Sequence, residues 1–391
     1  MAKKKKAAKK KTAKKKAPGK KAVKKKAAPK KANKKAKKKT PARKQQPTAL
    51  VTGACGFAGS HTTDELIAKG YKVVATDLES ADRKWLNPAA EFIPADITNI
   101  ETLKPLFKNG VDYVFHPAAV FDYEAPWELC EKVNVGGMRN MCEMALKKRV
   151  KRFVLFSTVS VYGWPEPHEL PVRENNPKRP GTNYEKSKWM QEEVGMEYHE
   201  KGLPVTTIRP APVYGPRNTY GVATMLFLMA KFPILPFPVN LNNNFVSVHV
   251  KDVANAAIFL ANNKKAVGEA YNVSDCSNYT IKEFVNHVCP LMGVKVIPTF
   301  IPQDVLYVLG NQVADASRRI ARFVGGRPLV EKDMVYYLKA DYAFSNEKLR
   351  SLGYQFVYPD MFPGMDETIE WYRDNKYLQV SDLWLKIVSR L

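Results

Sequence analysis

From Thr48 onward, short apolar runs alternate with segments that have the apolar spacing of helices. The predicted strands are TALVTG, YKVVATD, EFIPADI, VDYVFH and KRFVLFST, and helices are expected over 57–69, 100–109 and 124–148. Strands that are largely apolar, and that are separated by helix-length segments, are typical of parallel sheets covered by helices on both faces. The sequence therefore predicts an α/β fold with a doubly wound parallel sheet.

After about residue 210 the alternation loosens and prolines accumulate. This change predicts a smaller C-terminal lobe, made of several chain segments, that faces the substrate. The most apolar stretch, 222–239, contains Lys231 and three prolines, so it does not predict a simple membrane-spanning helix. We expect one catalytic domain over 47–375, followed by a C-terminal amphipathic extension over 376–391.

Positive charge is concentrated in the first 46 residues, here called the Lys-rich arm. The arm has 24 Lys and Arg residues and no acid, whereas the rest of the chain has 39 basic and 38 acidic residues. With no aromatic residue and almost no aliphatic residue larger than Ala, it cannot bury enough apolar surface to fold. We expect a disordered segment that binds polyanions by charge alone, with DNA as the leading partner and RNA or an anionic membrane as alternatives. A solubilising or targeting tail without a dedicated partner is the other interpretation.

A glycine-rich turn, TGACGFAG, joins the first strand to the helix that follows it. Such a turn lets the backbone approach a pyrophosphate, and the helix N-terminus supplies N–H donors; glycines that serve only a tight turn are the alternative. Asp77 ends the second strand, 18 residues after Gly59, where a carboxylate can bond ribose hydroxyls. Because this carboxylate would repel a 2′-phosphate, the sequence favours NAD over NADP, although Arg83 lies only six residues further on.

Two further strand ends are placed to meet the cofactor. Asp96 and Ile97 follow the third strand, where they are positioned to contact the adenine, although Asp96 could instead only cap the next helix. The segment HPAA, over 116–119, closes the fourth strand where the cofactor would cross the sheet.

The candidate catalytic residues follow the fifth strand. Thr158 lies at its end, and Tyr184 comes 26 residues later, at the start of a helical run. Lys188 is four residues beyond Tyr184, so both side chains lie on one face of the helix. A nearby cation lowers the pKa of a tyrosine by stabilising the phenolate. We therefore expect Tyr184 to move the proton that accompanies hydride transfer, while Thr158 hydrogen-bonds the substrate oxygen.

The order of these motifs resembles that of the extended short-chain dehydrogenases/reductases. This group has a Rossmann-like fold and includes nucleotide-sugar epimerases and dehydratases, 3β-hydroxysteroid dehydrogenases and dihydroflavonol reductases. The resemblance extends over TGACGFAGSH, ATD, ADI, HPAA, VNVGG, FSTVSVYG, YEKSK, RPAPVYGPR and FVSVHVKDVANA. The resemblance implies that Thr158, Tyr184 and Lys188 are the catalytic residues. It also implies that the protein forms a homodimer. The cofactor would be held by Gly53, Gly56, Phe57, Ala58, Gly59, Asp77, Asp96, Ile97, Ala118 and Asn134, together with Tyr184 and Lys188.

The substrate is indicated by weaker features. Pro212 stands where sugar epimerases of this group typically carry an asparagine, and Arg209-Pro210 resembles the steroid dehydrogenase and flavonol reductase branch. The apolar stretch 222–239 suits a hydrophobic ligand, or it is simply core. We expect an NAD-dependent oxidoreductase that interconverts a hydroxyl and a carbonyl on a hydrophobic, sterol-like substrate. A nucleotide-sugar epimerase or dehydratase is the first alternative, and a non-catalytic NAD-binding regulator tethered to nucleic acid by the arm is the second.

The cysteines and the N-terminal sequence indicate the cellular compartment in which the protein is expected. The five cysteines include no CxxC pair and are odd in number, which indicates free thiols rather than a disulfide framework or a zinc site. No apolar run typical of a signal peptide follows the charges of the arm. We expect a cytoplasmic protein with no metal and no transmembrane segment. Through the Lys-rich arm, association with the nucleoid or the nucleus is a further possibility.

Overall fold

A computed structural model of the chain describes residues 46–324 and 327–378. The described residues belong to one compact unit that begins at Gln46. The expectations for the Lys-rich arm before Gln46, and for the C-terminal extension beyond residue 378, concern residues outside this description.

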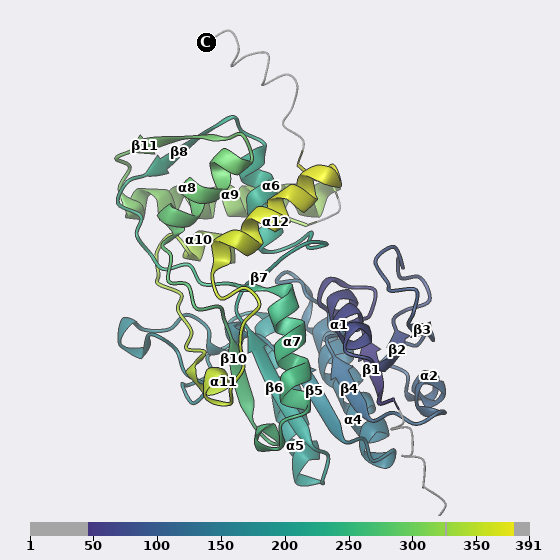
Figure 1. Ribbon diagram of the computed structural model, residues 1–391. Coiled ribbons are helices and arrows are strands. Elements are labelled where there is room, and N and C mark those ends of the chain that lie inside the picture. The colour runs from purple at the N-terminus through teal and green to yellow at the C-terminus, as the bar shows by residue number, and fades with distance from the viewer. Residues whose placement is uncertain (1–45, 325–326, 379–391) are drawn as a thin grey trace, which may run out of the picture. The chain divides into compact units, whose positions relative to one another are not determined.

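Seven parallel strands form the central sheet, in the order β10-β6-β5-β4-β1-β2-β3 (Figure 1). Their side chains are mostly buried, because helices cover both faces of the sheet. The arrangement confirms the predicted doubly wound, Rossmann-like α/β fold. The strands are β1 (Thr48–Thr52), β2 (Lys72–Thr76), β3 (Glu91–Phe92), β4 (Tyr113–His116), β5 (Arg152–Phe156), β6 (Val205–Pro210) and β10 (Ala270–Val273).

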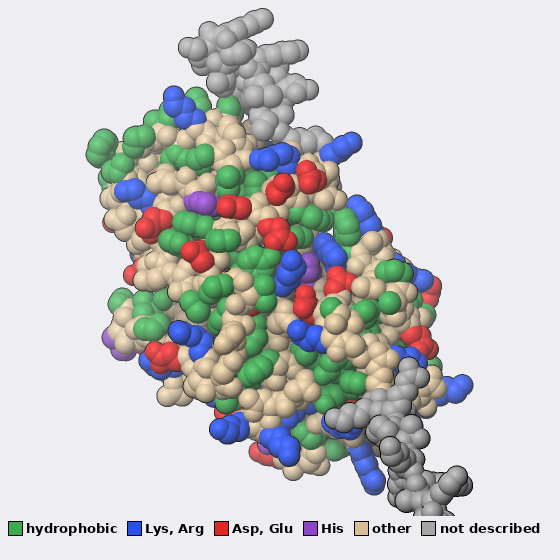
Figure 2. Space-filling model, in the orientation of Figure 1, with side chains coloured by type: hydrophobic (Ala, Val, Ile, Leu, Met, Phe, Trp, Pro, Cys, Tyr) green, Lys and Arg blue, Asp and Glu red, His purple; other side chains and the backbone are tan. Residues whose placement is uncertain are grey.

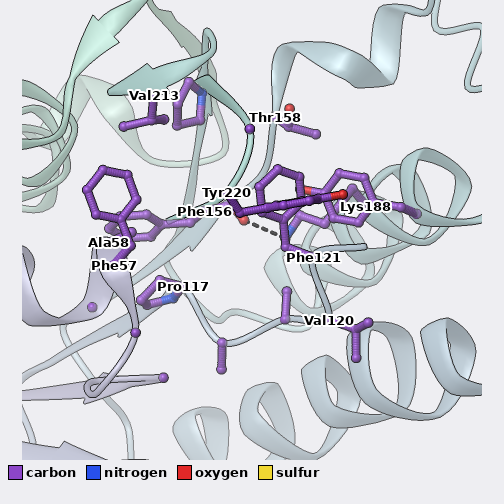
Figure 3. A pocket seen from close by; sticks show the side chains of 18 of the residues that line it. Phe57, Ala58, Pro117, Val120, Phe121, Phe156, Thr158, Lys188, Val213 and Tyr220 are labelled. Atoms are coloured by element: carbon purple, nitrogen blue, oxygen red, sulfur yellow. Dashed lines mark hydrogen bonds between the residues drawn. The ribbon is translucent and has the colours of Figure 1, made fainter. Parts of the chain in front are cut away.

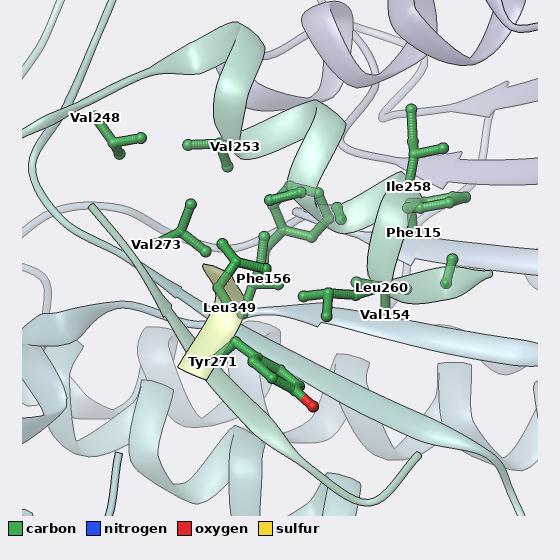
Figure 4. Close-up of a cluster of buried hydrophobic side chains, with 14 of the residues drawn as sticks. Phe115, Val154, Phe156, Val248, Val253, Ile258, Leu260, Tyr271, Val273 and Leu349 are labelled. Carbon is green, nitrogen blue, oxygen red and sulfur yellow. The ribbon is translucent and has the colours of Figure 1, made fainter. Parts of the chain in front are cut away.

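Successive residues of the central strands supply two different hydrophobic cores. On one face, Val154 belongs to the cluster that includes Ile258 and Leu260, which lies between the sheet and helix α7 (Figure 4). On the other face, Phe153 belongs to a cluster with Met141 from α4. Side chains alternate along a strand, so the four residues FVLF of β5 must all be apolar to fill both cores. The helices concerned are α1 (Phe57–Ala68) with α7 (Val250–Ala261), and α4 (Gly137–Lys147) with α5 (Asn183–Glu200).

The predicted elements differ from the observed ones mainly at their ends. The third strand is only β3, two residues long. The helix expected over 100–109 is α2 (Ile100–Leu103) followed by a 3₁₀ turn at Lys104–Phe107. The long helix expected over 124–148 begins as α3 (Trp127–Cys130), widens to π-helical geometry at Glu131–Gly136, and continues as α4.

The segments after residue 210 form the predicted smaller lobe, although α7 and β10 return to the central sheet. Its core contains Leu226, Phe284 and Met365, which come from three separate helices. Two short parallel pairs, β8 with β11 and β7 with β9, complete this region. The elements are β7 (Val213–Tyr214), α6 (Val222–Ala230), β8 (Ile234–Pro238), β9 (Val248–His249), α8 (Ile281–Leu291), β11 (Lys295–Thr299), α9 (Gln303–Val324), α10 (Lys332–Tyr336) and α12 (Met361–Asp374). Helix α11 (Glu347–Ser351) instead packs on β10 of the central sheet.

Acidic and basic side chains are intermingled on the face of the molecule drawn in Figure 2, in keeping with the balanced charge of the chain after the arm. All five cysteines are free thiols. Within 46–324 and 327–378, no three His, Cys, Asp or Glu side chains are grouped so as to hold a metal ion. None of the helices in those ranges combines the length and the apolar composition needed to cross a bilayer.

Candidate active site

The turn after β1 and the first residues of α1 form a backbone cradle at the end of the sheet. Gly53 has a left-handed backbone (φ 58°), and a Cβ there would lie 2.9 Å from the Cα of Ala118. A Cβ at Gly59 would lie 2.0 Å from the carbonyl oxygen of Gly53. Both positions therefore require glycine. Because no side chain caps the N-terminus of α1 at Gly56, the first N–H groups of this helix can bind an anion.

A cavity of about 770 Å³ joins this cradle to the smaller lobe. It passes the ends of β1 and β4, where the strand order reverses, which is where ligands bind in sheets of this kind. Apart from Asn134, all predicted site residues line it, namely Gly53, Gly56, Phe57, Ala58, Gly59, Asp77, Asp96, Ile97, Ala118, Thr158, Tyr184 and Lys188. Figure 3 labels Phe57, Ala58, Thr158 and Lys188 among them. The structure therefore brings together side chains that lie up to 135 residues apart in the sequence.

Asp77 lies at the cradle end of the cavity, directly after β2. Its carboxylate accepts hydrogen bonds from the backbone N–H groups of Cys55 (3.0 Å) and Leu78 (2.9 Å). Burial and the negative charge of Asp77 raise the pKa of Cys55 to about 11, so Cys55 is a protonated thiol. The two backbone donors hold the carboxylate at the cavity wall.

Arg83 does not line this end of the cavity. Its guanidinium donates to Glu79 Oε1 (2.7 Å) and lies 4.1 Å from the centre of the Phe92 ring. Arg83, which made the sequence-based preference for NAD weaker, is therefore bound to Glu79 and Phe92 and not to the cavity. Asp96 accepts from the N–H of Thr98 (2.8 Å), while Asn99, rather than Asp96, caps helix α2.

Cofactor preference gives a first prediction. We expect Asp77→Asn to lower discrimination against NADPH at least about fivefold, because a charge pair a few ångströms apart is worth about 1 to 4 kcal/mol. Fluorescence titrations with NADH and NADPH measure this, and Asp82→Asn, which changes a nearby carboxylate outside the cavity, is the matched control. A parent protein that already binds NADPH more tightly than NADH would contradict the role given to Asp77.

Tyr184 and Lys188 lie in the first turns of α5, which begins with a capping box formed by Thr182 and Glu185. Both side chains are buried, with 6% and 2% of their surface exposed. The Lys188 ammonium donates to the carbonyl oxygen of Phe156 (2.6 Å) and to Gln191 Oε1 (2.5 Å). These bonds fix the lysine nitrogen beside the end of β5.

The protonation of this pair differs from the sequence-based expectation. Burial raises the pKa of Tyr184, and the nearby charge of Glu185 raises it further. Burial also lowers the pKa of Lys188 to about 7, so its positive charge is itself weakened. The expected lowering of the Tyr184 pKa by Lys188 is therefore not found in this structure, because burial raises the pKa of the tyrosine.

Thr158 and Ser157 are adjacent, but their hydroxyls have different partners. The Thr158 hydroxyl donates to Ser160 Oγ (3.2 Å) and accepts from the Ser160 N–H (3.1 Å). The Ser157 hydroxyl instead lies 2.5 Å from a carboxylate oxygen of Glu192, which forms a buried ion pair with Arg209 (2.6 Å). Ser157 is thus tied to the protein interior, which supports the choice of Thr158.

Asn134 lies behind the cavity, in the π-helical stretch. Its side-chain oxygen accepts from the N–H of Val120 (2.7 Å), and its nitrogen donates to Ser187 Oγ (2.8 Å) and to the carbonyl oxygen of Val120 (3.2 Å). The Ser187 hydroxyl in turn donates to the carbonyl oxygen of Tyr184 (2.7 Å). Asn134 therefore links Val120, which lines the cavity, to Ser187 in the first turns of α5. Through these bonds it positions the segment that carries Tyr184, although Asn134 itself does not line the cavity.

Aromatic side chains that the sequence analysis did not single out cover Tyr184. The ring of Phe121 lies 5.0 Å and that of Tyr123 5.3 Å from the Tyr184 ring, and Phe121 contacts Tyr220 at 4.8 Å. Figure 3 shows Phe121 and Tyr220 beside each other, close to Lys188. The aromatic run directly after the HPAA motif was the available signal for Phe121 and Tyr123.

A buried carboxyl group stands at the lobe end of the cavity. Glu331 precedes α10, and it accepts a hydrogen bond from the Tyr220 hydroxyl (2.7 Å). Burial raises the pKa of Glu331. Neither residue belongs to a motif, so only the fold brings Glu331 to the cavity.

Comparison with known proteins identifies the family. Residues 49–274 match the family model described as NAD dependent epimerase/dehydratase family. The chain belongs to this family. A protein of Methanocaldococcus jannaschii, named as a candidate UDP-glucose 4-epimerase, is 32% identical over 257 residues, which are 62% of this chain and 83% of that protein. The sterol-4-alpha-carboxylate 3-dehydrogenase (decarboxylating) of Bos taurus is 27% identical over 267 residues, 64% of this chain and 72% of the bovine enzyme.

The solved structures agree with the fold. The UDP-glucose 4-epimerase of Thermotoga maritima, crystallised with UDP-glucose, superposes with a TM-score of 0.66 at 25% identity, over 84% of this chain and 99% of that chain. Family members are NAD-dependent epimerases, dehydratases and dehydrogenases of the extended short-chain type, and several matching structures contain NAD. The protein is therefore an NAD-dependent enzyme of this type. Its cradle fits NAD, since only glycine can occupy positions 53 and 59 beside the free end of α1.

Proposed function

We propose that the protein interconverts a hydroxyl and a carbonyl group on a hydrophobic substrate, with NAD(H) as the redox partner. The observation that carries this proposal is the composition of the lobe end of the cavity. Its lining there is aromatic and aliphatic, with Phe121, Tyr123, Leu129, Tyr220, Val222, Met225, Phe245, Met334 and Tyr337. Such a wall favours a rigid apolar ligand that is held by surface contact and by a few polar groups.

The charges around the cavity support the same choice. A nucleotide-sugar carries a diphosphate, which proteins usually bind through Arg or Lys. Among the described residues that line the cavity, none is an arginine, and the cations are Lys132 and Lys188. Lys188 is held by Phe156 and Gln191, and Glu331 would bring a carboxyl group towards any anion at the lobe end.

The protein side chains have distinct tasks in this reaction. NAD, when bound, supplies the acceptor for the hydride that leaves the substrate carbon. When the carbonyl is reduced, Tyr184, whose raised pKa keeps it protonated, gives its proton to the substrate oxygen. When the hydroxyl is oxidised, the phenolate form of Tyr184 takes that proton back. In both directions Thr158 hydrogen-bonds the same oxygen. Lys188, one helical turn beyond Tyr184, would stabilise this phenolate when it is itself protonated. Phe121 and Tyr123 cover the tyrosine and keep water from it.

Nucleotide-sugar epimerisation is the second candidate, and the comparisons favour it. The Methanocaldococcus relative and the Thermotoga structure are named for UDP-glucose 4-epimerase activity, whereas the bovine sterol dehydrogenase is the less similar of the two relatives. Epimerisation would use the same Tyr184 and Thr158. The two candidates therefore differ in what the lobe end of the cavity binds.

Ligand protection against thermal unfolding separates the two substrate classes. With NADH present, we expect hydrophobic cyclic alcohols to raise the Tm by several degrees, since a ligand at 100 times its Kd stabilises by about 2.7 kcal/mol. UDP and dTDP should leave it within one degree (~0.5 kcal/mol or less). Protection by UDP or dTDP, with no response to any hydrophobic alcohol, would overturn the first candidate in favour of the second.

A further inference from the structure

Helix α9 carries an unusual row of exposed apolar side chains. Only Ala314 and Ala321 of this 22-residue helix are buried. Six of its exposed apolar residues are spaced so that they fall on one face of the helix. They are Val305, Val308, Leu309, Val313, Ile320 and Phe323, with exposed fractions from 46% for Val305 to 93% for Phe323. We refer to these six residues as the α9 stripe.

The opposite side of α9 is the one that packs on the protein. A Cβ at Gly310 would lie 2.8 Å from Val335 of α10, so the two helices are in close contact there. The hydroxyl of Ser317, two turns further along, accepts from the N–H groups of Leu329 (2.7 Å) and Val330 (3.1 Å). The α9 stripe therefore faces away from the body, over a length of about 27 Å at 1.5 Å per residue.

The stripe ends beside the substrate cavity. Arg318 donates to Glu124 Oε1 (2.6 Å), and Arg327 donates to the carbonyl oxygen of Phe121 (3.3 Å), so the C-terminal half of α9 adjoins the loop that covers Tyr184. On the cavity side of this junction, Phe121 and Leu129 are themselves 42% and 43% exposed. Exposed apolar side chains thus lie both on α9 and on the cavity loop, and the Arg318–Glu124 ion pair joins these two segments.

Positive charge accompanies the stripe. Arg319 and Arg322 are exposed on α9 and have no carboxylate partner among the described residues, whereas the nearby Asp315 is paired with Lys332 (3.0 Å). The same chain carries the 24 Lys and Arg residues of the arm. An exposed apolar helix face bordered by cations is typical of helices that lie in the interface of an anionic membrane, where the cations are attracted to the lipid headgroups.

We propose that the α9 stripe docks this enzyme on an anionic lipid bilayer, with the mouth of its cavity towards the membrane. An apolar substrate dissolved in the lipid would then reach Tyr184 without crossing water. The docking itself does not depend on the proposed function, because vesicle binding is measured without substrate or turnover. The delivery of substrate does rest on the proposed function.

Vesicle flotation of the full-length protein tests the docking. Phosphatidylcholine vesicles with and without phosphatidylserine are used at low and high salt, because salt screens the Lys-rich arm but not apolar contacts. The test variant is Leu309→Gln with Ile320→Gln. The matched control is Met196→Gln with Val357→Gln, which changes two exposed apolar residues outside the stripe. NADH binding by both variants verifies their folding.

We expect the parent and the control to bind phosphatidylserine vesicles, and to keep part of this binding at high salt. The stripe variant should lose at least about tenfold in binding at high salt, since it removes two apolar side chains from the interface. Equal binding of all three proteins would overturn the proposal, as would complete loss of parent binding at high salt, which would assign it to the arm. A parent that binds no vesicles but forms a dimer broken by the stripe variant would show instead that the stripe is a contact between two copies.

Discussion

Replacing Tyr184 with Phe is expected to lower turnover by at least about 10²-fold while NADH affinity stays within about twofold. The reason is that the substitution removes one hydroxyl, the group that moves the proton at the substrate oxygen, and a positioned acid or base contributes about 10²- to 10⁴-fold. Because Tyr184 is buried beneath Phe121 and Tyr123, the phenylalanine keeps the same ring contacts. Steady-state rates and fluorescence titration with NADH measure the two effects.

A matched variant removes a phenol elsewhere. Tyr113→Phe deletes the hydroxyl of a strand residue that hydrogen-bonds Asn262 (3.3 Å) outside the cavity, and it should retain full turnover. If Tyr184→Phe keeps the parent's turnover, then Tyr184 is not the proton-transfer group. A parallel loss in both variants would point to general damage.

Gly59→Ala should reduce NAD affinity at least about tenfold, because each 1.4 kcal/mol of lost binding free energy is a factor of ten. The added Cβ would lie 2.0 Å from the carbonyl oxygen of Gly53, so the turn and the start of α1 must move apart. Overpacking of this kind also costs about 1 to 3 kcal/mol of folding stability. Calorimetric titration with NAD and a thermal melt separate the loss of binding from the loss of stability.

Gly181→Ala is the control for this change. Its Cβ would be 3.5 Å from Glu185, an ordinary contact, and Gly181 does not line the cavity. It should bind NAD as the parent does. Unchanged NAD affinity in Gly59→Ala would mean that the cofactor does not use the cradle.

Most of the central sheet could be predicted from the sequence because its chemistry is local. The run FVLF in β5 is apolar at every position, and this pattern distinguishes a sheet covered on both faces from an amphipathic one. The turn between Gly53 and Gly59 was predictable for the same reason, since its glycines follow directly after a strand. The π-helical widening at Glu131–Gly136 was not, because the apolar spacing on both sides of it is helical.

Only those site residues that belong to a sequence motif could be predicted. Tyr184, Lys188 and Thr158 line one cavity, as their spacing indicated. Their protonation was not predictable, because burial, which decides the pKa of Tyr184, is a property of the fold. Glu331 comes from a distant segment that has no motif of its own. Asn134 belongs to a motif, yet its bonds to Val120 and Ser187 are visible only in the structure.

The stoichiometry of NADH formation tests the central claim most directly. Purified protein is incubated with NAD and either a hydrophobic cyclic alcohol or UDP-glucose, and NADH absorbance is compared with the substrate consumed. Net oxidation of the apolar alcohol, with about one NADH formed for each molecule consumed and a loss of at least about 10²-fold in Tyr184→Phe, is the result that the proposal predicts. Conversion of UDP-glucose to its epimer without net NADH, and without any reaction of the alcohols, would contradict it, because an epimerase returns the hydride to its substrate.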